Sequence, residues 1–230
     1  MIRFRDIDTA GILDNPPSYD AFKEIKAINP LSSEQLHSFW DKLFGCEDEP
    51  HPLDGVNVHA ETFGRSQDEF HFDFKIEGKL QESIEPFSPE KWKELSESER
   101  IKAINEFSVQ LADQLDIERK PKIKYFQDDD DICGTYYTDT NVLTVNKNLL
   151  HYPEELVDTI AHEIRHAYQY QRALKAETKQ DYLYRFNFEH YVSPIKMDDG
   201  SYVLFTEYQD QLVEAEARAF ADIFRKEVSE

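Results

Sequence analysis

Three residues in the second half of the chain have the types and spacing of a metal-dependent hydrolytic site. His162 and His166 are four residues apart, and Glu163 follows the first histidine, in the pattern HExxH. On a helix, side chains four apart lie on one face, so one ion can reach both rings. Catalytic zinc takes three protein ligands and leaves a fourth position for water. The pattern predicts that His162 and His166 bind Zn²⁺ and that Glu163 acts as general base toward the bound water.

A helix is expected around these residues. Pro153 suits the first helical position, and Glu154 and Glu155 place negative charge near the N-terminus. A histidine pair on a charged helix can also be merely solvated, so the residues around the pair decide. Ile164 is expected to face the core. The pattern runs to about Ala176, with apolar or small residues at helical spacing: Leu156, Val157, Ile160, Ala161, Ile164 and Ala167. This apolar setting favours a metal site.

Strands are expected before that helix, at 122–126, 134–138 and 141–146. Before an HExxH helix they resemble the small antiparallel sheet that flanks the motif helix in zinc peptidases, and this resemblance implies such a sheet here. An exposed sheet edge can pair with an extended peptide, and 141–146 is the expected edge strand. The Asp128–Asp131 run is expected to be an acidic turn, since it lacks the spaced ligands of a calcium loop.

A third ligand is expected downstream. Residues 214–221 read Glu-Ala-Glu-Ala-Arg-Ala-Phe-Ala and predict a helix with an apolar stripe. HExxH followed by this ExxA pattern resembles the gluzincin-type zincins, in which a later helix supplies a glutamate ligand. The resemblance covers roughly residues 122–226. It implies a zincin-like metallopeptidase domain with Glu214 as the third zinc ligand.

Glu216 is the alternative ligand on the same helix. The two carboxylates lie about 200° apart at 3.6 residues per turn, so only one of them can reach the ion. Glu214 lies near the apolar side marked by Ala217 and Ala221, whereas Glu216 is expected to point toward Arg218 and solvent. Glu214 is therefore the expected ligand.

The chain departs from the resemblance at Arg218, where many gluzincins carry an aspartate that holds a ligand histidine. A metal-bound histidine normally donates its other ring N–H to a carboxylate or carbonyl group. The partner must therefore come from elsewhere in the chain. The candidates are Asp158, Glu207 and Asp210.

Composition limits the classes of partner. The chain has 230 residues, 40% of them hydrophobic, and a formal net charge of −21. Such acidity argues against nucleic acid, because binding duplex phosphates draws on clustered lysine and arginine. We interpret the charge as a solubility feature, although it could also steer cationic partners. No run of apolar residues predicts a membrane span or a signal peptide, so a cytoplasmic location is expected, although export without a cleavable signal would leave the same sequence. Cys46 and Cys133 make no disulfide framework.

Two parts are expected. Residues 1–80 predict an N-terminal α+β module of unknown role, and residues 90–230 the zincin-like domain. Residues 81–89, with Pro86 and Pro89, are the expected linker. The expected elements outside the sheet and the motif helix are helices at 19–27 and 33–44, a β-hairpin of 56–63 and 69–76, and a helix or helix pair over 90–115.

The segment between the ligands, 181–211, is rich in aromatic residues. Strands are expected at 184–188 and 201–205. A tyrosine or histidine there can donate a hydrogen bond to a forming oxyanion, and Tyr191 and His190 are the candidates.

The sequence thus predicts an α+β protein that hydrolyses peptide bonds of a peptide or protein substrate with Zn²⁺. Two alternatives remain open: a non-catalytic interaction module with a zincin fold, and a toxin-like or effector-like protease with one dedicated target. The substrate and the oligomeric state are left undetermined.

Overall fold

The computed structural model describes residues 56–128, 132–197 and 199–229. The chain divides into two compact units, and the residues from Thr62 onward belong to one of them. The helices expected at 19–27 and 33–44 lie outside the described residues, as do Cys46 and most of the aspartate run. Among the described helices, none has the length and apolar character needed to cross a membrane.

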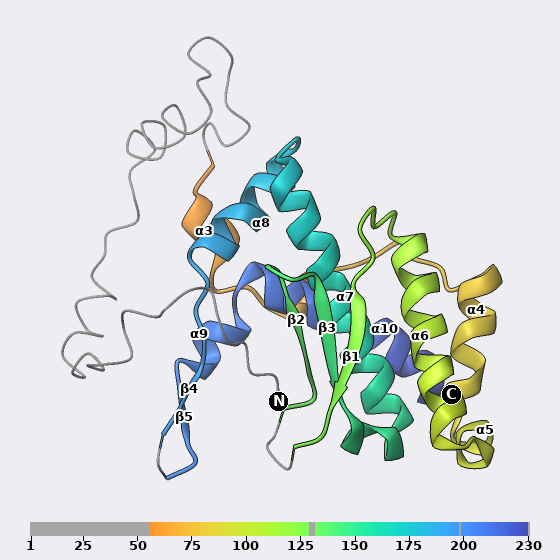
Figure 1. Cartoon of the computed structure of the whole chain (residues 1–230). Coiled ribbons are helices and arrows are strands. Elements are labelled where there is room, and N and C mark those ends of the chain that lie inside the picture. The colour runs from red at the N-terminus through yellow and green to blue at the C-terminus, as the bar shows by residue number, and fades with distance from the viewer. Residues whose placement is uncertain (1–55, 129–131, 198, 230) are drawn as a thin grey trace. The chain divides into compact units, whose positions relative to one another are not determined.

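The expected strands form a three-stranded sheet with the order β1-β3-β2 (Figure 1). β1 (Lys122–Phe126) pairs in parallel with β3 (Val142–Asn146), and β2 (Gly134–Tyr137) pairs antiparallel with β3. The sheet is therefore mixed and not wholly antiparallel. The prediction that 141–146 is an edge strand was wrong, because β2 folds back onto one side of β3 and β1 occupies the other. The edge strand that contacts the motif helix is β2.

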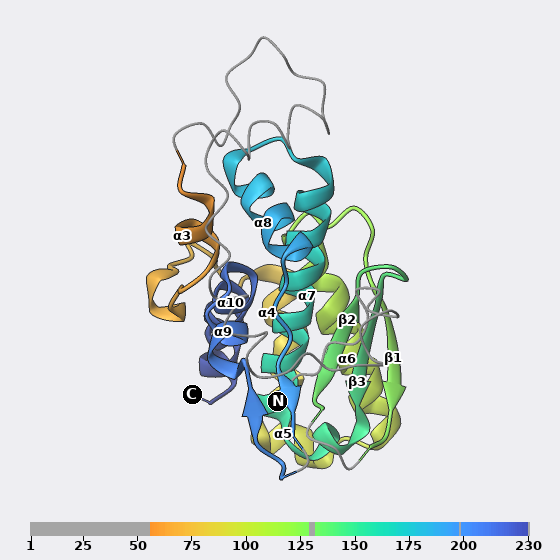
Figure 2. The ribbon, with the colours of Figure 1, turned by 90° about the vertical axis from the view of Figure 1, so that its left-hand side faces the viewer.

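The motif helix is α7 (Pro153–Lys175), which begins with the predicted proline and ends at Ala176 in the left-handed conformation. Figure 2 shows α7 between the sheet on one side and α10 (Leu212–Ser229) on the other. Every residue from Ala161 to Ala167 is buried, and Ile164 faces the core as expected. The histidines therefore lie in the interior of the molecule.

The hairpin expected at 56–63 and 69–76 is absent from the described residues. Val58–Thr62 form helix α3, and Gln67–Glu69 form a 3-10 helix. Residues 70–77 are irregular, with alternate side chains packed inward, yet they pair with no strand in the described part of the chain. Phe72 and Phe74 instead contact Phe220 of α10, with ring centroids 5.3 and 5.1 Å apart. The alternation in the sequence thus reflects a chain lying along a helix.

The linker expected at 81–89 is helical. The segment contains α4 (Gly78–Ile84) and a 3-10 helix (Glu85–Phe87), and α5 (Pro89–Glu94) and α6 (Glu97–Gln114) follow. Pro86 and Pro89 lie in the first turns of two of these helices, where proline needs no amide hydrogen. Phe87 is fully buried and stacks on Trp92 at 4.8 Å. These residues therefore belong to the same core as α7.

The segment between the ligands holds α8 (Lys179–Glu189), β4 (Ile195–Lys196), β5 (Tyr202–Val203) and α9 (Phe205–Gln209). The strand predicted at 184–188 was wrong, because these residues continue a helix that Thr178 and Asp181 start with a reciprocal capping box. Of the strand predicted at 201–205, only Tyr202 and Val203 pair, with β4.

Candidate metal centre

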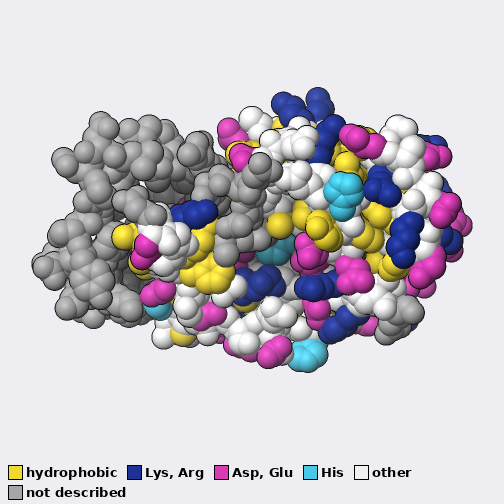
Figure 3. Space-filling model, turned by 90° about the horizontal axis from the view of Figure 1, so that it is seen from below, with side chains coloured by type: hydrophobic (Ala, Val, Ile, Leu, Met, Phe, Trp, Pro, Cys, Tyr) yellow, Lys and Arg dark blue, Asp and Glu magenta, His cyan; other side chains and the backbone are white. Residues whose placement is uncertain are grey.

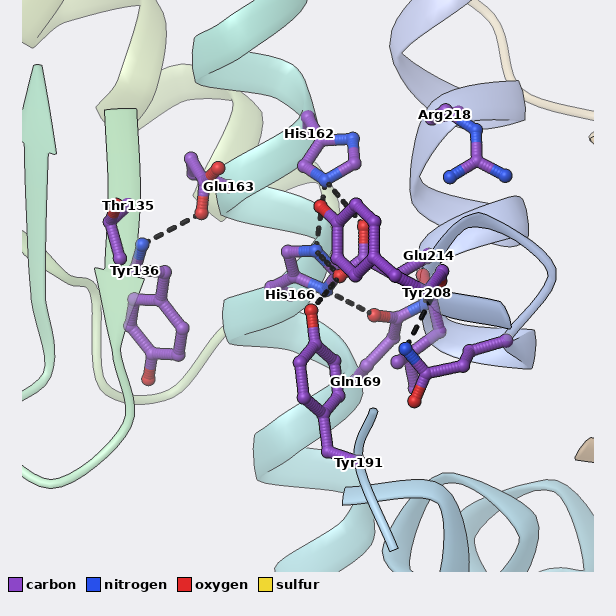
Figure 4. Close-up of polar contacts among 12 residues, drawn as sticks. Thr135, Tyr136, His162, Glu163, His166, Gln169, Tyr191, Tyr208, Glu214 and Arg218 are labelled. Carbon is purple, nitrogen blue, oxygen red and sulfur yellow. Dashed lines mark hydrogen bonds and ion pairs between the residues drawn. The ribbon is translucent and has the colours of Figure 1, made fainter. Parts of the chain in front are cut away.

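α7 and α10 bring His162, His166 and Glu214 together (Figure 4). The two histidine Nε2 atoms are 2.9 Å apart. Glu214 Oε1 lies 3.2 Å from His166 Nε2, and Oε2 lies 3.4 Å from His162 Nε2. One ligand atom from each residue can be chosen so that all three lie within 4.8 Å of one another. The structure thus places the three residues predicted as ligands around one point.

These separations suit a small ion with tetrahedral ligands. Ligand atoms about 2.0–2.1 Å from a tetrahedral zinc lie about 3.3 Å from each other, close to the observed distances. Two imidazoles and one carboxylate form a donor set of catalytic zinc sites. Glu214 Oε2 is buried and has no hydrogen-bond donor among the described residues. A cation would compensate this oxygen, so the residues present fit a metal.

Burial and mutual attraction together set the charge states of the three side chains, which are at most 3% exposed. Desolvation, with repulsion from His166, lowers the pKa of His162 to about 4, so its ring is neutral. Burial alone would lower the pKa of His166 and raise that of Glu214. The attraction between these two groups reverses both directions. Without a metal, His166 and Glu214 share an ion pair, and a metal ion would replace its proton.

Gln169 orients the second histidine. Its Oε1 lies 2.9 Å from His166 Nδ1, and its Nε2 donates to the Val213 carbonyl at 3.1 Å. Because the amide nitrogen is committed to Val213, the oxygen must face His166 and accept Nδ1–H. When the proton on Nε2 is replaced by a metal ion, the lone pair of His166 is therefore on Nε2, which points toward His162 and Glu214. This role of Gln169 was not predicted from the sequence, in which the one signal is an amide side chain about one helical turn after His166.

Glu163 lies on the same turn of α7 as His162 and His166 and points toward β2 (Figure 4). Its Oε2 accepts the Tyr136 backbone N–H at 2.7 Å, whereas its buried Oε1 has no partner among the described residues. A Cβ added at Gly134 would lie 2.7 Å from Thr159 Cγ2 and 2.8 Å from the Thr144 carbonyl oxygen, so glycine permits this close approach of strand and helix. Burial raises the pKa of Glu163 to about 7.

Two tyrosines from the segment between the ligands surround Glu214. The Tyr191 hydroxyl donates to Glu214 Oε1 at 2.6 Å, and Tyr208 lies beside the same carboxylate (Figure 4). Burial, and then the charge of Glu214, raise the pKa of both hydroxyls well above the usual value, so both remain donors. Gln211 fixes the segment by pairing both polar atoms of its amide with the backbone of Val192, at 2.7 and 2.8 Å.

His190, the other expected oxyanion donor, contributes nothing to this cluster. Its ring stacks on Phe186 at 4.1 Å, and its Nδ1 lies 2.9 Å from the Phe186 carbonyl oxygen at the end of α8. It is also exposed. Of the two candidates, the structure brings only Tyr191 to the site.

Glu216 points away from the ligands, as the helical angle predicts, but it does not point to solvent. It is 3% exposed and accepts from Arg165 Nε at 2.9 Å and from Tyr184 OH at 2.6 Å. Arg165 also lies over the rings of Phe72, Tyr168 and Phe220, at 4.5–5.0 Å. The expectation of a solvent-facing Glu216 was wrong because Arg165 and α8 cover that side of α10. This ion pair joins α7 to α10.

A carboxylate was expected to hold a ligand histidine. For His166 the observed partner is the amide of Gln169. Asp158 is largely buried, and the charged groups around it are Arg225, Asp222 and Glu155, not the ligand histidines. Glu207 and Asp210 stay predictions for His162. Arg218, at the position where an aspartate was expected, donates to the Gln209 carbonyl and faces the same side of α10 as Glu214.

Comparison of the chain with models of protein families, with curated proteins and with solved structures found no match. The α+β class follows from the elements themselves. The function must therefore be argued from the geometry of the site.

Proposed function

We propose that this protein is a zinc-dependent metallopeptidase of the gluzincin type, with His162, His166 and Glu214 as ligands. The observation that carries the proposal is the buried cluster of these three residues, whose ligand atoms approach one another at 2.9–3.4 Å. It is supported by Glu163, a buried carboxyl group on the next position of the same helix. The proposed substrate is a peptide or a protein.

When bound, zinc supplies a Lewis acid and lowers the pKa of water from 15.7 to about 7. The rest of the chemistry belongs to the side chains. Glu163 Oε2 is held by the Tyr136 amide, and Oε1 has no partner in the described part of the chain, so Oε1 is the oxygen available to a proton. A carboxyl group with a pKa of about 7 can both take and return a proton at neutral pH. Glu163 would accept the proton of water and pass it to the leaving amine.

Tyr191 and Tyr208 are hydroxyl donors beside the ligand Glu214. Both keep their protons, because burial raises the pKa of each hydroxyl. A preorganised O–H donor stabilises an oxyanion more strongly in a buried site than in water. Tyr191 is bonded to Glu214 here, so it would have to exchange that acceptor for the oxyanion of the substrate.

Metal analysis tests the proposal directly. Purified wild-type protein is expected to contain about one zinc per chain, because catalytic sites of this donor set hold one ion. Glu214→Ala removes a ligand and should lose the metal, whereas Glu155→Ala changes an exposed carboxylate of α7 and should keep it. The measurement is zinc content by atomic emission after gel filtration. A folded wild-type protein that takes up no zinc would refute the metal site.

The contact of Gln169 with His166 gives a graded prediction. Gln169→Leu removes the acceptor that fixes the ring, and loss of such a partner typically weakens zinc binding by about 10–100-fold. Gln171→Leu is the matched control, because that amide bonds the backbone of Arg119 and no ligand. Competition with a chromophoric chelator measures both dissociation constants. Equal zinc affinity in the two variants would contradict the role of Gln169.

A further inference from the structure

Four buried side-chain polar atoms in the described part of the chain have no hydrogen-bond partner, and three of them lie at or near the metal centre. They are Glu163 Oε1, Glu214 Oε2 and Arg218 Nη1. A metal ion and water would account for the two carboxylate oxygens. A cation cannot account for Arg218 Nη1, because a guanidinium donor needs an acceptor and is repelled by positive charge. The acceptor of Arg218 Nη1 is therefore water or an anionic group of a ligand, and the charge of the guanidinium favours the anion.

Arg218 is placed to present that ligand to the metal centre. It is one helical turn after Glu214 on α10, so both side chains lie on the same side of the helix. Figure 4 shows Arg218 on α10 next to Glu214, on the side of the helix that carries this ligand. The Gln209 carbonyl holds Nη2 and leaves Nη1 directed elsewhere. An anion bound there would lie on the side of α10 that carries the ligand Glu214.

A pocket of about 320 Å³ adjoins Arg218. Arg65, Gln67 and Gln209 line it with groups that include hydrogen-bond donors, and Asp210 contributes one negative charge. Arg65 is also bonded to Glu69 at 2.9 Å, outside the lining. Arg65 is therefore already paired, whereas Arg218 forms no ion pair among the described residues, so its guanidinium is the uncompensated positive charge of the lining.

This local charge opposes that of the whole chain. The formal net charge is −21, and on the face shown in Figure 3 the basic side chains are scattered among acidic ones. Long-range steering would not attract an anion to such a protein. Recognition of an anion must therefore come from local donors, and a guanidinium matches a carboxylate geometrically by forming two parallel hydrogen bonds.

From these observations we infer that Arg218 and its pocket bind a carboxylate group of the substrate, close to the bond that is cut. This inference rests on the proposed peptidase function, because the bound carboxylate belongs to a substrate only if the protein cleaves peptides. The carboxylate can come from an acidic side chain or from the C-terminus of a peptide, and both present the same planar pair of oxygens. A C-terminal source would make the enzyme act near chain ends, and a side-chain source would make it select acidic residues.

The test measures binding without catalysis. The probes are N-acetyl-glutamate amide for a side-chain carboxylate, N-acetyl-alanine for a terminal one, and N-acetyl-glutamine amide as the neutral control. Their dissociation constants are measured by protein-observed NMR on zinc-free wild-type protein, Arg218→Met and Arg218→Lys. Zinc-free protein prevents the carboxylates from binding the ion directly, so a failed metal site and a failed carboxylate site give different results.

One carboxylate probe is expected to bind wild type at least about tenfold more tightly than the neutral probe, and the tighter one identifies the source. Arg218→Met should lose this preference, because it keeps the length of the side chain without donors. Arg218→Lys should retain part of it, since lysine keeps the charge but not the planar pair of donors. Equal affinity for the three probes in wild type, or an unchanged preference in Arg218→Met, would overturn the inference.

Discussion

Glu163→Gln is expected to retain about one zinc per chain and to hydrolyse peptides about 10²–10⁴-fold more slowly than wild type. The substitution removes the proton acceptor and changes no ligand. It also keeps the contact with β2, because an amide oxygen can accept the Tyr136 N–H that Glu163 Oε2 accepts at 2.7 Å. The measurements are turnover of a quenched fluorescent peptide library and zinc content, made on the same preparation.

Folding should not limit this experiment. Burial raises the pKa of Glu163 in the folded protein to about 7, above its ordinary value of 4.5. Ionising this carboxyl group therefore costs folding free energy at pH values above the unfolded pKa, and glutamine removes that cost. Glu155→Gln, at an exposed position of the same helix, is the matched control and should keep full activity. Full activity in Glu163→Gln would exclude Glu163 as the base, whereas zinc without activity in wild type would favour a non-catalytic module or a single dedicated target.

The local parts of the site could be predicted from the sequence because they depend on helical geometry alone. HExxH places two rings on one face, and the apolar spacing of α7 makes that face interior. The angle between Glu214 and Glu216 separated the two carboxylates correctly. The same geometry could not show what covers the other side of α10, which depends on how α7 and α8 pack. For this reason the burial of Glu216 was missed.

Other differences between the predicted and the observed structure also arise from packing between segments that are distant in the sequence. The alternation at 70–77 predicted correctly which side chains point inward, but a helix surface and a neighbouring strand can bury the same alternate positions. Likewise, strand patterns identified β1, β2 and β3 without giving their order, because β3 gains its central place only by pairing on both sides. Gln169 bonds at once to a residue one turn away and to the carbonyl of a residue on another helix. No pattern within one segment contains that second contact.

Glu216→Ala is expected to lower the free energy of unfolding by about 3–5 kcal/mol, the usual cost of removing one member of a buried ion pair. The substitution would leave the Arg165 guanidinium, 8% exposed, without its carboxylate acceptor. It would also remove the acceptor of Tyr184, which bonds Glu216 at 2.6 Å. The measurement is urea denaturation followed by circular dichroism, with zinc removed so that metal binding does not add to stability.

Two further variants distinguish the buried Arg165–Glu216 pair from a solvent-exposed salt bridge. Glu85→Ala breaks the Lys91–Glu85 pair, whose side chains are 58% and 54% exposed, and should change stability far less because solvent screens such pairs. The double variant Arg165→Met with Glu216→Leu should recover much of the lost stability, since it leaves neither charge unpaired. A loss no larger than that of Glu85→Ala would show that the buried pair contributes little.

Glu216→Ala also tests whether Glu214 and Glu216 of α10 have different roles, one as a metal ligand and the other in an ion pair. Glu216 is bonded to Arg165, the residue immediately before His166, while Glu214 approaches His166 from two positions earlier on α10. The ion pair therefore holds the two helices in the alignment that the ligands require, without contributing a ligand. Folded Glu216→Ala should still bind about one zinc per chain, in contrast to Glu214→Ala. If instead Glu216→Ala lost zinc and Glu214→Ala kept it, the assignment of the third ligand would have to be reversed.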